Sequence, residues 1–224
     1  MSTTAEKSGL DGMLAGSPAE WELLAVLDDR LVTEELRSLL RHVLSRRGLA
    51  VCFIGQEGVG KTTAADQLAA VLDALAVPRQ RLHRAAFATN LFLVPFLVLD
   101  NRYRRRRLLI LDRSVYDNLA VHGARYGLSP RLLSFAAMIV SAAYPRLDVR
   151  FHLHCRLDLL RRRRPTKDER TAARQAAAYA CVARCLAFTS AETSTPLLRR
   201  VLSVLEQTVR LTIADPATGK RTTP

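Results

Sequence analysis

Short apolar runs alternate along the chain with longer segments in which apolar residues recur at helical spacing. LAVCFI (49–54) and LLIL (108–111) are apolar at every position, which is typical of parallel strands buried on both faces. VRFHLH (149–154) alternates apolar and polar residues and predicts a third strand. RLHRAAF (81–87) and TVRLTIAD (208–215) predict two more. The pattern therefore predicts about five strands separated by helices.

Alternation of strands and helices along a chain is typical of βαβ units built around a parallel sheet. We therefore expect an α/β fold in which a central parallel sheet of about five strands is flanked by helices. One helix is predicted to begin with Ser129 as its N-cap and Pro130 at its first position. The predicted helices cover residues 62–75, 91–104 (bent or bounded at Pro95), 129–144, 171–188 and a segment that begins at about 158.

An extra segment precedes the first predicted strand. Residues 1–16 are small and polar, and we expect them to be disordered. SPAE (17–20) has the form of a capping box and predicts a first helix. A second helix is expected from Thr33, as N-cap, to about Arg47, with Gly48 ending it in the left-handed conformation. We divide the 224 residues into a disordered terminus (1–16), an N-terminal helical extension (17–48) and one domain (49–224).

Arginine dominates the charge of the chain. The net charge is +13, and only four of the 34 basic residues are lysines. A positive field favours anionic partners, among which we weigh small anions above nucleic acid. The four cysteines form no CxxC pair and predict no disulfide framework. The longest apolar stretch (132–144) is too short to span a bilayer, and no signal-peptide pattern is present, so we expect a cytoplasmic protein without membrane insertion.

A glycine-rich loop follows the first predicted strand and begins a helix. GQEGVGKTT satisfies GxxxxGK[ST], in which glycines let several backbone N–H groups point at one phosphate. Lys61 can reach the β- and γ-phosphates of a nucleotide, and Thr62 can supply a hydroxyl to Mg²⁺. The sequence therefore predicts a P-loop NTPase fold that binds a nucleoside triphosphate and Mg²⁺, and the loop alone leaves GTPases, ATPases and small-molecule kinases open. The expected loop residues are Gly55, Gln56, Glu57, Gly58, Val59, Gly60, Lys61, Thr62 and Thr63.

A second pair of polar residues follows the strand LLIL. Asp112 and Arg113 come directly after its last residue. Because the carboxyl ends of parallel strands lie at the same edge of a sheet, both should lie near the P-loop. Asp112 is expected to bind Mg²⁺ directly or through water, and Arg113 is expected to hold a second phosphate.

Together these motifs resemble the thymidylate kinase family of P-loop nucleoside monophosphate kinases. That family carries G-x-[DE]-G-x-G-K-[ST]-T, a later DR[YF], and a P-D strand followed by a basic lid. The matching segments here are GQEGVGKTT, LLILDRS and RLDVRFHLHC, within residues 49–179. The resemblance implies that Glu57 faces the acceptor's sugar, Arg113 its phosphate and Lys61 the transferring phosphoryl group.

The resemblance also implies a lid, at about residues 156–171, that closes over ATP. Members of the family place a catalytic arginine either in the P-loop or in the lid. Val59 occupies the variable P-loop position here, so the lid should supply the charge. The candidates are Arg161, Arg162, Arg163 and Arg164.

The sequence departs from the family where the acceptor should bind. DRY is replaced by DRS, with Tyr116 two residues further on, and Pro-Asp is replaced by Leu147-Asp148. Phe96 is a candidate for the base-stacking aromatic, although core packing is its favoured role. The family's helix after the last strand is not predicted. The expected acceptor-binding residues are Glu57, Arg84, Arg102, Arg113 and Tyr116.

Three functions remain open from the sequence. The first is transfer of the γ-phosphoryl group of ATP to a nucleoside monophosphate, with a pyrimidine deoxynucleotide as the expected acceptor. The second is phosphorylation of a nucleoside, sugar or natural-product hydroxyl on the same scaffold. The third is a non-catalytic P-loop protein that binds nucleotide or nucleic acid. The family resemblance adds the expectation of a homodimer.

Two further patterns receive weaker interpretations. His152 and His154 alternate on a predicted strand, and packed or solvent-facing histidines are favoured over a metal site. The two RRRR segments are expected to differ, because residues 104–107 precede a strand whereas residues 161–164 follow one. Only the second segment should lie at the edge that carries the P-loop, roughly 16 Å from the first.

Overall fold

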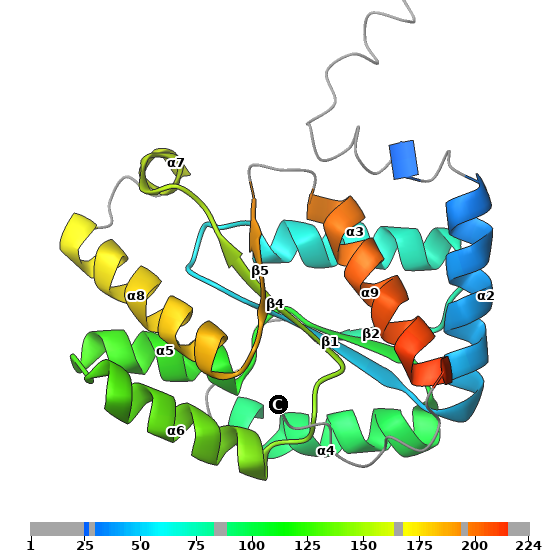
Figure 1. The fold of residues 1–224 in the computed structure, drawn as a ribbon, viewed down its shortest axis with the longest axis horizontal. Helices are drawn as coiled ribbons and strands as arrows, with labels where there is room; N and C mark the ends of the chain where they lie inside the picture. The colour runs from blue at the N-terminus through cyan, green and yellow to red at the C-terminus, as the bar shows by residue number, and fades with distance from the viewer. Residues whose placement is uncertain (1–24, 27–29, 83–88, 164–167, 194–196, 215–224) are drawn as a thin grey trace, which may run out of the picture.

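A five-stranded parallel sheet with helices on both faces forms the described part of the chain (Figure 1). This is a computed structural model, and it describes residues 25–26, 30–82, 89–163, 168–193 and 197–214. The strands are β1 Leu49–Ile54, β2 Arg79–Leu82, β3 Leu108–Leu111, β4 Val149–His154 and β5 Thr189–Glu192. The helices are α2 Arg30–Arg46, α3 Lys61–Ala74, α4 Val94–Asp100, α5 Val115–Arg125, α6 Pro130–Ala143, α7 Leu157–Arg163, α8 Glu169–Cys185 and α9 Leu197–Ala214, with π-helical segments Thr89–Leu93 and Asn101–Arg105 on either side of α4.

The strand order places the P-loop and Asp112 at one edge of the sheet. The order is β2-β3-β1-β4-β5, and every neighbouring pair is parallel. Leu49 pairs with Leu108, and Cys52 pairs with Leu111, so β1 and β3 end close together. The P-loop after β1 and Asp112 after β3 therefore share the carboxyl edge. The predicted α/β fold with a central parallel sheet is confirmed.

Two hydrophobic cores cover the two faces of the sheet. Alternate residues of β1 enter different cores, because successive side chains of a strand point to opposite faces. Phe53 belongs to the core formed with α2, α3 and α9, whereas Cys52 belongs to the core formed with α4, α5, α6 and α8. All six residues of β1 are buried, as its continuous apolar pattern predicts. Because β1 is the middle strand of the sheet, the P-loop that follows it begins at the middle of the carboxyl edge.

The last predicted strand is wrong. Residues 208–214 belong to α9 instead, a helix that supplies the final layer over β4 and β5. Its buried residues recur at helical spacing from Leu197 to Val209, which an eight-residue window at its end does not reveal. The fifth strand is β5, a short edge strand with the polar sequence TSAE. The helix after the last strand, which was not predicted, is therefore present.

The N-terminal predictions are partly wrong. Thr33 lies inside α2, which begins at Arg30, so it is not an N-cap. Gly48 is not among the glycines with positive φ. A Cβ at Gly48 would lie 2.2 Å from the backbone oxygen of Asn101, so close approach of two chain segments explains the glycine. The predicted capping box (17–20) lies outside the described residues.

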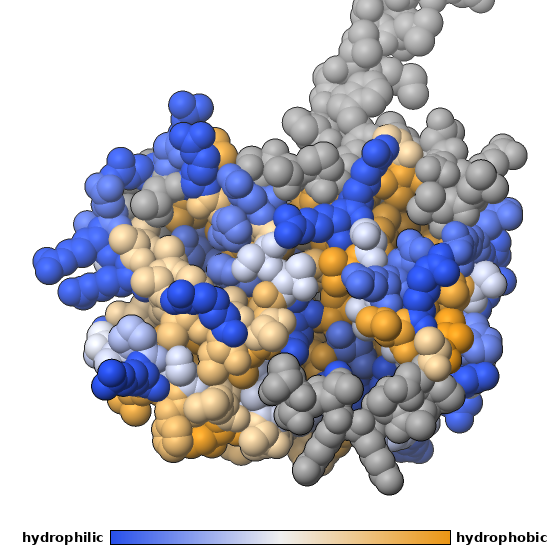
Figure 2. Space-filling view, in the orientation of Figure 1, coloured by the Kyte–Doolittle hydropathy of each residue, from blue (hydrophilic) through white to orange (hydrophobic). Residues whose placement is uncertain are grey.

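The outer surface differs between helices. Figure 2 shows apolar side chains gathered over α6 and hydrophilic ones around α7 and the outer end of α8. The exposed apolar residues of α6 are Leu132, Phe135, Met138 and Ile139. Within the described ranges, none of the helices is both long enough and apolar enough to cross a membrane.

Candidate active site

The P-loop curls between β1 and α3 with a backbone that only glycine adopts easily. Gly55 and Gly60 have φ values of 149° and 99°, in a region that side chains disfavour. A Cβ at Gly55 would also lie 2.2 Å from the backbone oxygen of Leu153 on β4. Gly60 is the N-cap of α3, so the loop presents its N–H groups and the helix N-terminus together. This is the backbone geometry that binds phosphate.

Lys61 lies inside this loop. It is the first residue of α3, and its ammonium donates hydrogen bonds to the backbone oxygens of Gly55 and Gln56, the second at 2.9 Å. The side chain is 6% exposed, and burial lowers the pKa of the ammonium. The loop therefore holds a desolvated positive charge beside N–H groups suited to an anion.

Asp112 and Thr62 form the polar contact expected of a magnesium site. Thr62 Oγ1 donates to Asp112 Oδ2 at 3.0 Å. The other carboxylate oxygen, Asp112 Oδ1, is buried and accepts no hydrogen bond within the described residues. A buried oxygen of this kind is costly unless a cation or water approaches it. The pair of oxygen donors therefore fits Mg²⁺, which prefers hydroxyl, carboxylate and water ligands.

Arg81, on β2, was not predicted as a site residue. Its guanidinium forms an ion pair with Asp66 and lies 3.8 Å from Asp112 Oδ2. It also donates to the backbone oxygen of Thr62 at 3.3 Å. Arg81 therefore holds the Asp112 carboxylate and the start of α3 together from the edge of the sheet.

Asp117 is the second residue that the sequence analysis missed. It is 1% exposed and accepts hydrogen bonds from the N–H groups of Gly55 and Ser114 and from the hydroxyl of Tyr179. The same carboxylate lies 4.0 Å from the Lys61 ammonium. It therefore connects the P-loop, the turn after β3 and α8. The signal in the sequence was the capping box S-x-x-D that Ser114 and Asp117 form at the start of α5.

The pKa of Asp117 yields a pH-dependent prediction. Burial raises this pKa from 3.8 to about 6, although Lys61 opposes the shift. Between about pH 4 and about pH 6 the folded protein therefore binds more protons at Asp117 than the unfolded chain does, so this carboxyl lowers the free energy of unfolding as the pH rises. The free energy of unfolding of the wild type minus that of Asp117→Asn should therefore decrease from about pH 4 to about pH 6. Denaturant unfolding at several pH values measures this difference.

A neighbouring residue serves as the control for this measurement. Asn118 is half-buried on the same helix and does not titrate, so Asn118→Ala should leave the pH dependence of stability unchanged. If the Asp117→Asn and wild-type profiles stayed parallel from pH 4 to pH 7, the buried position of the Asp117 carboxyl would be contradicted.

Arg113 lies where the sequence predicts, at the carboxyl end of β3. It is partly exposed. Burial lowers the pKa of Lys61 and raises that of Asp117, and the positive charge of Arg113 makes a smaller contribution that lowers both pKa values. Its guanidinium makes no hydrogen bond to another residue in the described part of the chain. Glu57 is exposed at the P-loop and also acts on the pKa of Lys61, after the larger effects of burial and Asp117. Both side chains border the P-loop.

One arginine of the predicted lid contacts the P-loop. Arg163, at the end of α7, donates to the backbone oxygen of Gly58 at 3.2 Å. Arg161 instead forms an ion pair with Glu169 at the start of α8, and Arg162 is exposed. Arg164 lies outside the described residues. Of the described lid arginines, Arg163 is therefore the one beside the phosphate-binding loop.

Other predicted acceptor residues lie elsewhere. Arg102 is at the amino edge of the sheet, where its guanidinium binds the Asp148 carboxylate at 2.8 Å. Tyr116 is 2% exposed and packs edge-on against two aromatic rings of the core, those of Tyr144 and Phe188. Neither side chain joins the P-loop residues. Phe96 is 69% exposed, so the core role favoured for it is wrong. Arg84 lies outside the described residues.

Comparisons with known proteins place the fold. No protein-family model matches the sequence, and no curated protein sequence matches it. Polyphosphate kinase 2 from Arthrobacter aurescens TC1 is similar in structure, with a TM-score of 0.51 and 12% identity over 88% of this chain and 85% of that chain. Thymidylate kinase from Candida albicans has a TM-score of 0.48 and 16% identity over 75% of this chain and 93% of that one. The five-stranded parallel α/β fold of this chain is therefore similar to that of the polyphosphate kinase 2 structure.

Proposed function

We propose that this protein is an ATP- and Mg²⁺-dependent phosphotransferase that passes the γ-phosphoryl group of ATP to a nucleoside monophosphate, in the manner of a thymidylate kinase. One observation carries the proposal. The P-loop lysine, the Thr62 hydroxyl and the Asp112 carboxylate meet at the carboxyl edge of one parallel sheet, and one buried oxygen of Asp112 accepts no hydrogen bond from the described residues. A P-loop that only binds an anion does not need that buried carboxylate, whereas a nucleotide–Mg²⁺ complex does.

Each residue has a distinct part in this proposal. Lys61 neutralises charge on the β- and γ-phosphate oxygens, and the N–H groups of the loop orient the same phosphates. Thr62 and Asp112 hold Mg²⁺, which supplies further charge neutralisation on the transferring group. Arg163 contacts Gly58 of the P-loop, and in this proposal it adds positive charge beside the transferring phosphoryl group. Phosphoryl transfer depends mainly on such positioning and neutralisation.

The acceptor phosphate is assigned to Arg113. This side chain follows Asp112 directly and has no ion pair within the described residues, so its guanidinium is available for an anion. Glu57 borders the same loop and can accept a hydrogen bond from a sugar hydroxyl. A pyrimidine deoxynucleoside monophosphate is the acceptor that the family resemblance favours.

A second acceptor class is supported by a specific observation. Arg102 and Tyr116, two of the residues expected to bind the acceptor nucleotide, lie in an ion pair at the far edge and in the core. Fewer groups than the resemblance implied therefore remain for an acceptor nucleotide. Phosphorylation of a nucleoside, sugar or natural-product hydroxyl is the alternative that this placement favours.

The test is ADP release measured with a panel of deoxynucleoside monophosphates, nucleosides and sugars in the presence of ATP and Mg²⁺. The proposal expects release above the ATP-only background with at least one nucleoside monophosphate. Release with nucleosides or sugars alone would assign the second acceptor class. Absence of release with every acceptor would contradict both.

Two neighbouring lid arginines provide a matched pair. Arg163→Ala should lower kcat about a hundredfold, because a charge beside the transferring phosphoryl group is lost. Arg162→Ala, on the same helix and exposed, should change kcat by no more than about twofold. Steady-state kinetics with the best acceptor measures both. Equal effects of the two substitutions would contradict the assignment of Arg163.

A further inference from the structure

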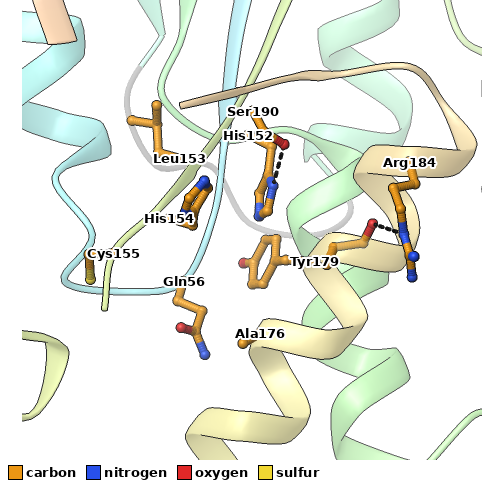
Figure 3. Close-up of a pocket in the computed structure, with 10 residues that line it drawn as sticks. Gln56, His152, Leu153, His154, Cys155, Ala176, Tyr179, Arg184 and Ser190 are labelled. Carbon is orange, nitrogen blue, oxygen red and sulfur yellow. Dashed lines mark hydrogen bonds between the residues drawn. The ribbon is translucent and has the colours of Figure 1, made fainter. Parts of the chain in front are cut away.

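A cavity of about 530 Å³ lies beside the P-loop, between the carboxyl ends of β4 and β5 and the helix α8 (Figure 3). Its volume is in the range of sites that hold a small organic molecule. None of the roles proposed above uses it. The side chains that define it are those of Gln56, His152, His154, Ala176, Tyr179 and Ser190.

The lining of this cavity combines apolar and polar groups and carries little charge. Burial lowers the pKa of His152 to about 4, with smaller contributions from His154 and Lys61, so its imidazole is neutral at neutral pH. Among the described residues that line the cavity there is no carboxylate, and Arg184 carries the one guanidinium. A cationic ligand would therefore lack a counter-charge. In the described residues no group of three His, Cys, Asp or Glu side chains could hold a metal ion.

Aromatic rings form one wall of the cavity. The rings of Tyr179 and His152 lie 9° from parallel with centroids 6.4 Å apart, so a planar ligand parallel to one ring is nearly parallel to the other. Ala176 and Ala180 on α8 leave room in front of these rings, because neither side chain extends beyond Cβ. Aromatic walls of this kind bind planar rings by stacking.

The polar groups suit the edge of a nitrogen heterocycle. Gln56 Nε2 donates to the backbone oxygen of Ala172, which leaves its Oε1 as an acceptor toward the cavity. His152 Nδ1 is 3.3 Å from the Ser190 hydroxyl, so its other ring nitrogen is available to a ligand. Amide and imidazole groups next to aromatic faces are the groups with which proteins hydrogen-bond and stack nucleobases.

The cavity is also connected to the phosphate-binding loop. The backbone oxygen of Gln56 accepts a hydrogen bond from Lys61, and its side chain borders the cavity. Tyr179 lines the cavity with its ring and donates its hydroxyl to Asp117, which in turn binds the Gly55 N–H. A ring in the cavity would therefore contact two residues that position the loop.

From these contacts we infer that the cavity binds a nucleobase-like planar heterocycle, and that His152 and Tyr179 stack against it while Gln56 reads its edge. The inference rests on the proposed function. In that reaction either the ATP held by the P-loop or the acceptor nucleotide would bring such a ring to this position. The ring can belong to the phosphoryl donor or to the acceptor. Adenosine and the pyrimidine nucleosides distinguish these two sources.

Direct binding of adenosine, thymidine and cytidine to the full chain tests the inference. Ala176→Phe fills the cavity, and we expect it to weaken binding of the preferred nucleoside about tenfold or more. Ala177→Phe is the matched control, because Ala177 is exposed on the same helix, and it should change the affinity by no more than about twofold. Tighter binding of adenosine assigns the donor's base, and tighter binding of thymidine or cytidine assigns the acceptor's.

A second measurement uses the wild-type protein and does not depend on the folding of any variant. Titration with the bound nucleoside should shift the imidazole NMR signals of His152 and His154. Those of His42 on α2 and His122 on α5 should stay unchanged, since neither lines the cavity. Binding that leaves His152 and His154 unshifted, or that Ala176→Phe and Ala177→Phe affect equally, would overturn the inference.

Inorganic triphosphate separates this inference from the proposed function. It should bind the wild type and Ala176→Phe equally and should lose binding in Lys61→Ala. If triphosphate binds while none of the nucleosides does, the cavity inference fails and the P-loop assignment stands. If nucleosides bind at the cavity while triphosphate does not bind, the proposed function fails and the cavity inference stands.

Discussion

Replacing Lys61 with alanine should lower the rate of phosphoryl transfer by about a thousandfold or more. The ammonium is 6% exposed and lies within the curl of the loop, so alanine at this position removes the buried charge beside the N–H groups that bind the phosphates. The loss should appear in kcat, because the charge on the transferring oxygens is neutralised most strongly in the transition state. Steady-state ADP release with the best acceptor measures the effect.

The first arginine segment provides the control for this substitution. Arg104 and Arg105 pair with the half-buried Asp100 before β3 begins, at the amino edge of the sheet. Replacing both with glutamine removes two positive charges but none near the P-loop, and turnover should change by no more than about twofold. A large loss in this double variant, or turnover that survives Lys61→Ala, would contradict the placement of the reaction at the carboxyl edge.

Asp112→Asn should lower turnover about a hundredfold and raise the Mg²⁺ concentration required for half-maximal rate. The carboxylate is 4% exposed, and its Oδ1 accepts no hydrogen bond among the described residues, so the substitution removes the charge that a bound cation would meet. An amide at this position can still accept a hydrogen bond from Thr62. A Mg²⁺ titration of turnover should therefore separate loss of metal binding from loss of structure.

A second carboxylate, at the end of α3 far from the P-loop, serves as the control. Asp73 pairs with Arg79 at the end of α3, away from the P-loop. Asp73→Asn should leave the Mg²⁺ dependence of turnover unchanged. An Asp112→Asn variant with the wild-type Mg²⁺ requirement would contradict the proposed ligand.

The parts of the fold that local pattern determines were predicted well. β1 and β3 are continuous apolar runs, and burial on both faces makes such runs distinctive. The end of the chain was misread because VRLTI alternates like a strand, although the preceding two turns make it part of the amphipathic helix α9. β5 escaped prediction because an edge strand of four residues, TSAE, carries no apolar signal.

Some residues of the candidate site could likewise be predicted from the sequence, and others could not. Lys61, Thr62 and Asp112 could be predicted, because their positions follow from the loop motif and from the direction of two parallel strands. Asp117 could not be, since the local capping box accounts for its presence at the start of α5. Its contact with the P-loop joins residues 62 positions apart, which only the packing of α5 beneath the loop produces.

Two of the predicted acceptor residues lie away from the P-loop. Arg102 was placed by resemblance near the reaction, but the π-helical segment that carries it ends at the amino edge, where Asp148 neutralises it. Tyr116 was expected to replace the DRY tyrosine, but helical geometry directs it into the core beside Tyr144. Spacing along the sequence determines neither the sheet edge that Arg102 reaches nor the face of α5 on which Tyr116 lies.

The most direct test of the account follows the γ-phosphoryl group itself. ATP labelled in that group is incubated with Mg²⁺ and each acceptor of the panel, and the label is traced in the separated products. The account predicts label on a nucleoside monophosphate with the wild type and with the Arg104/Arg105 double variant, and none above background with Lys61→Ala. Label that remains on ATP with every acceptor, or that is transferred equally well by Lys61→Ala, would contradict it.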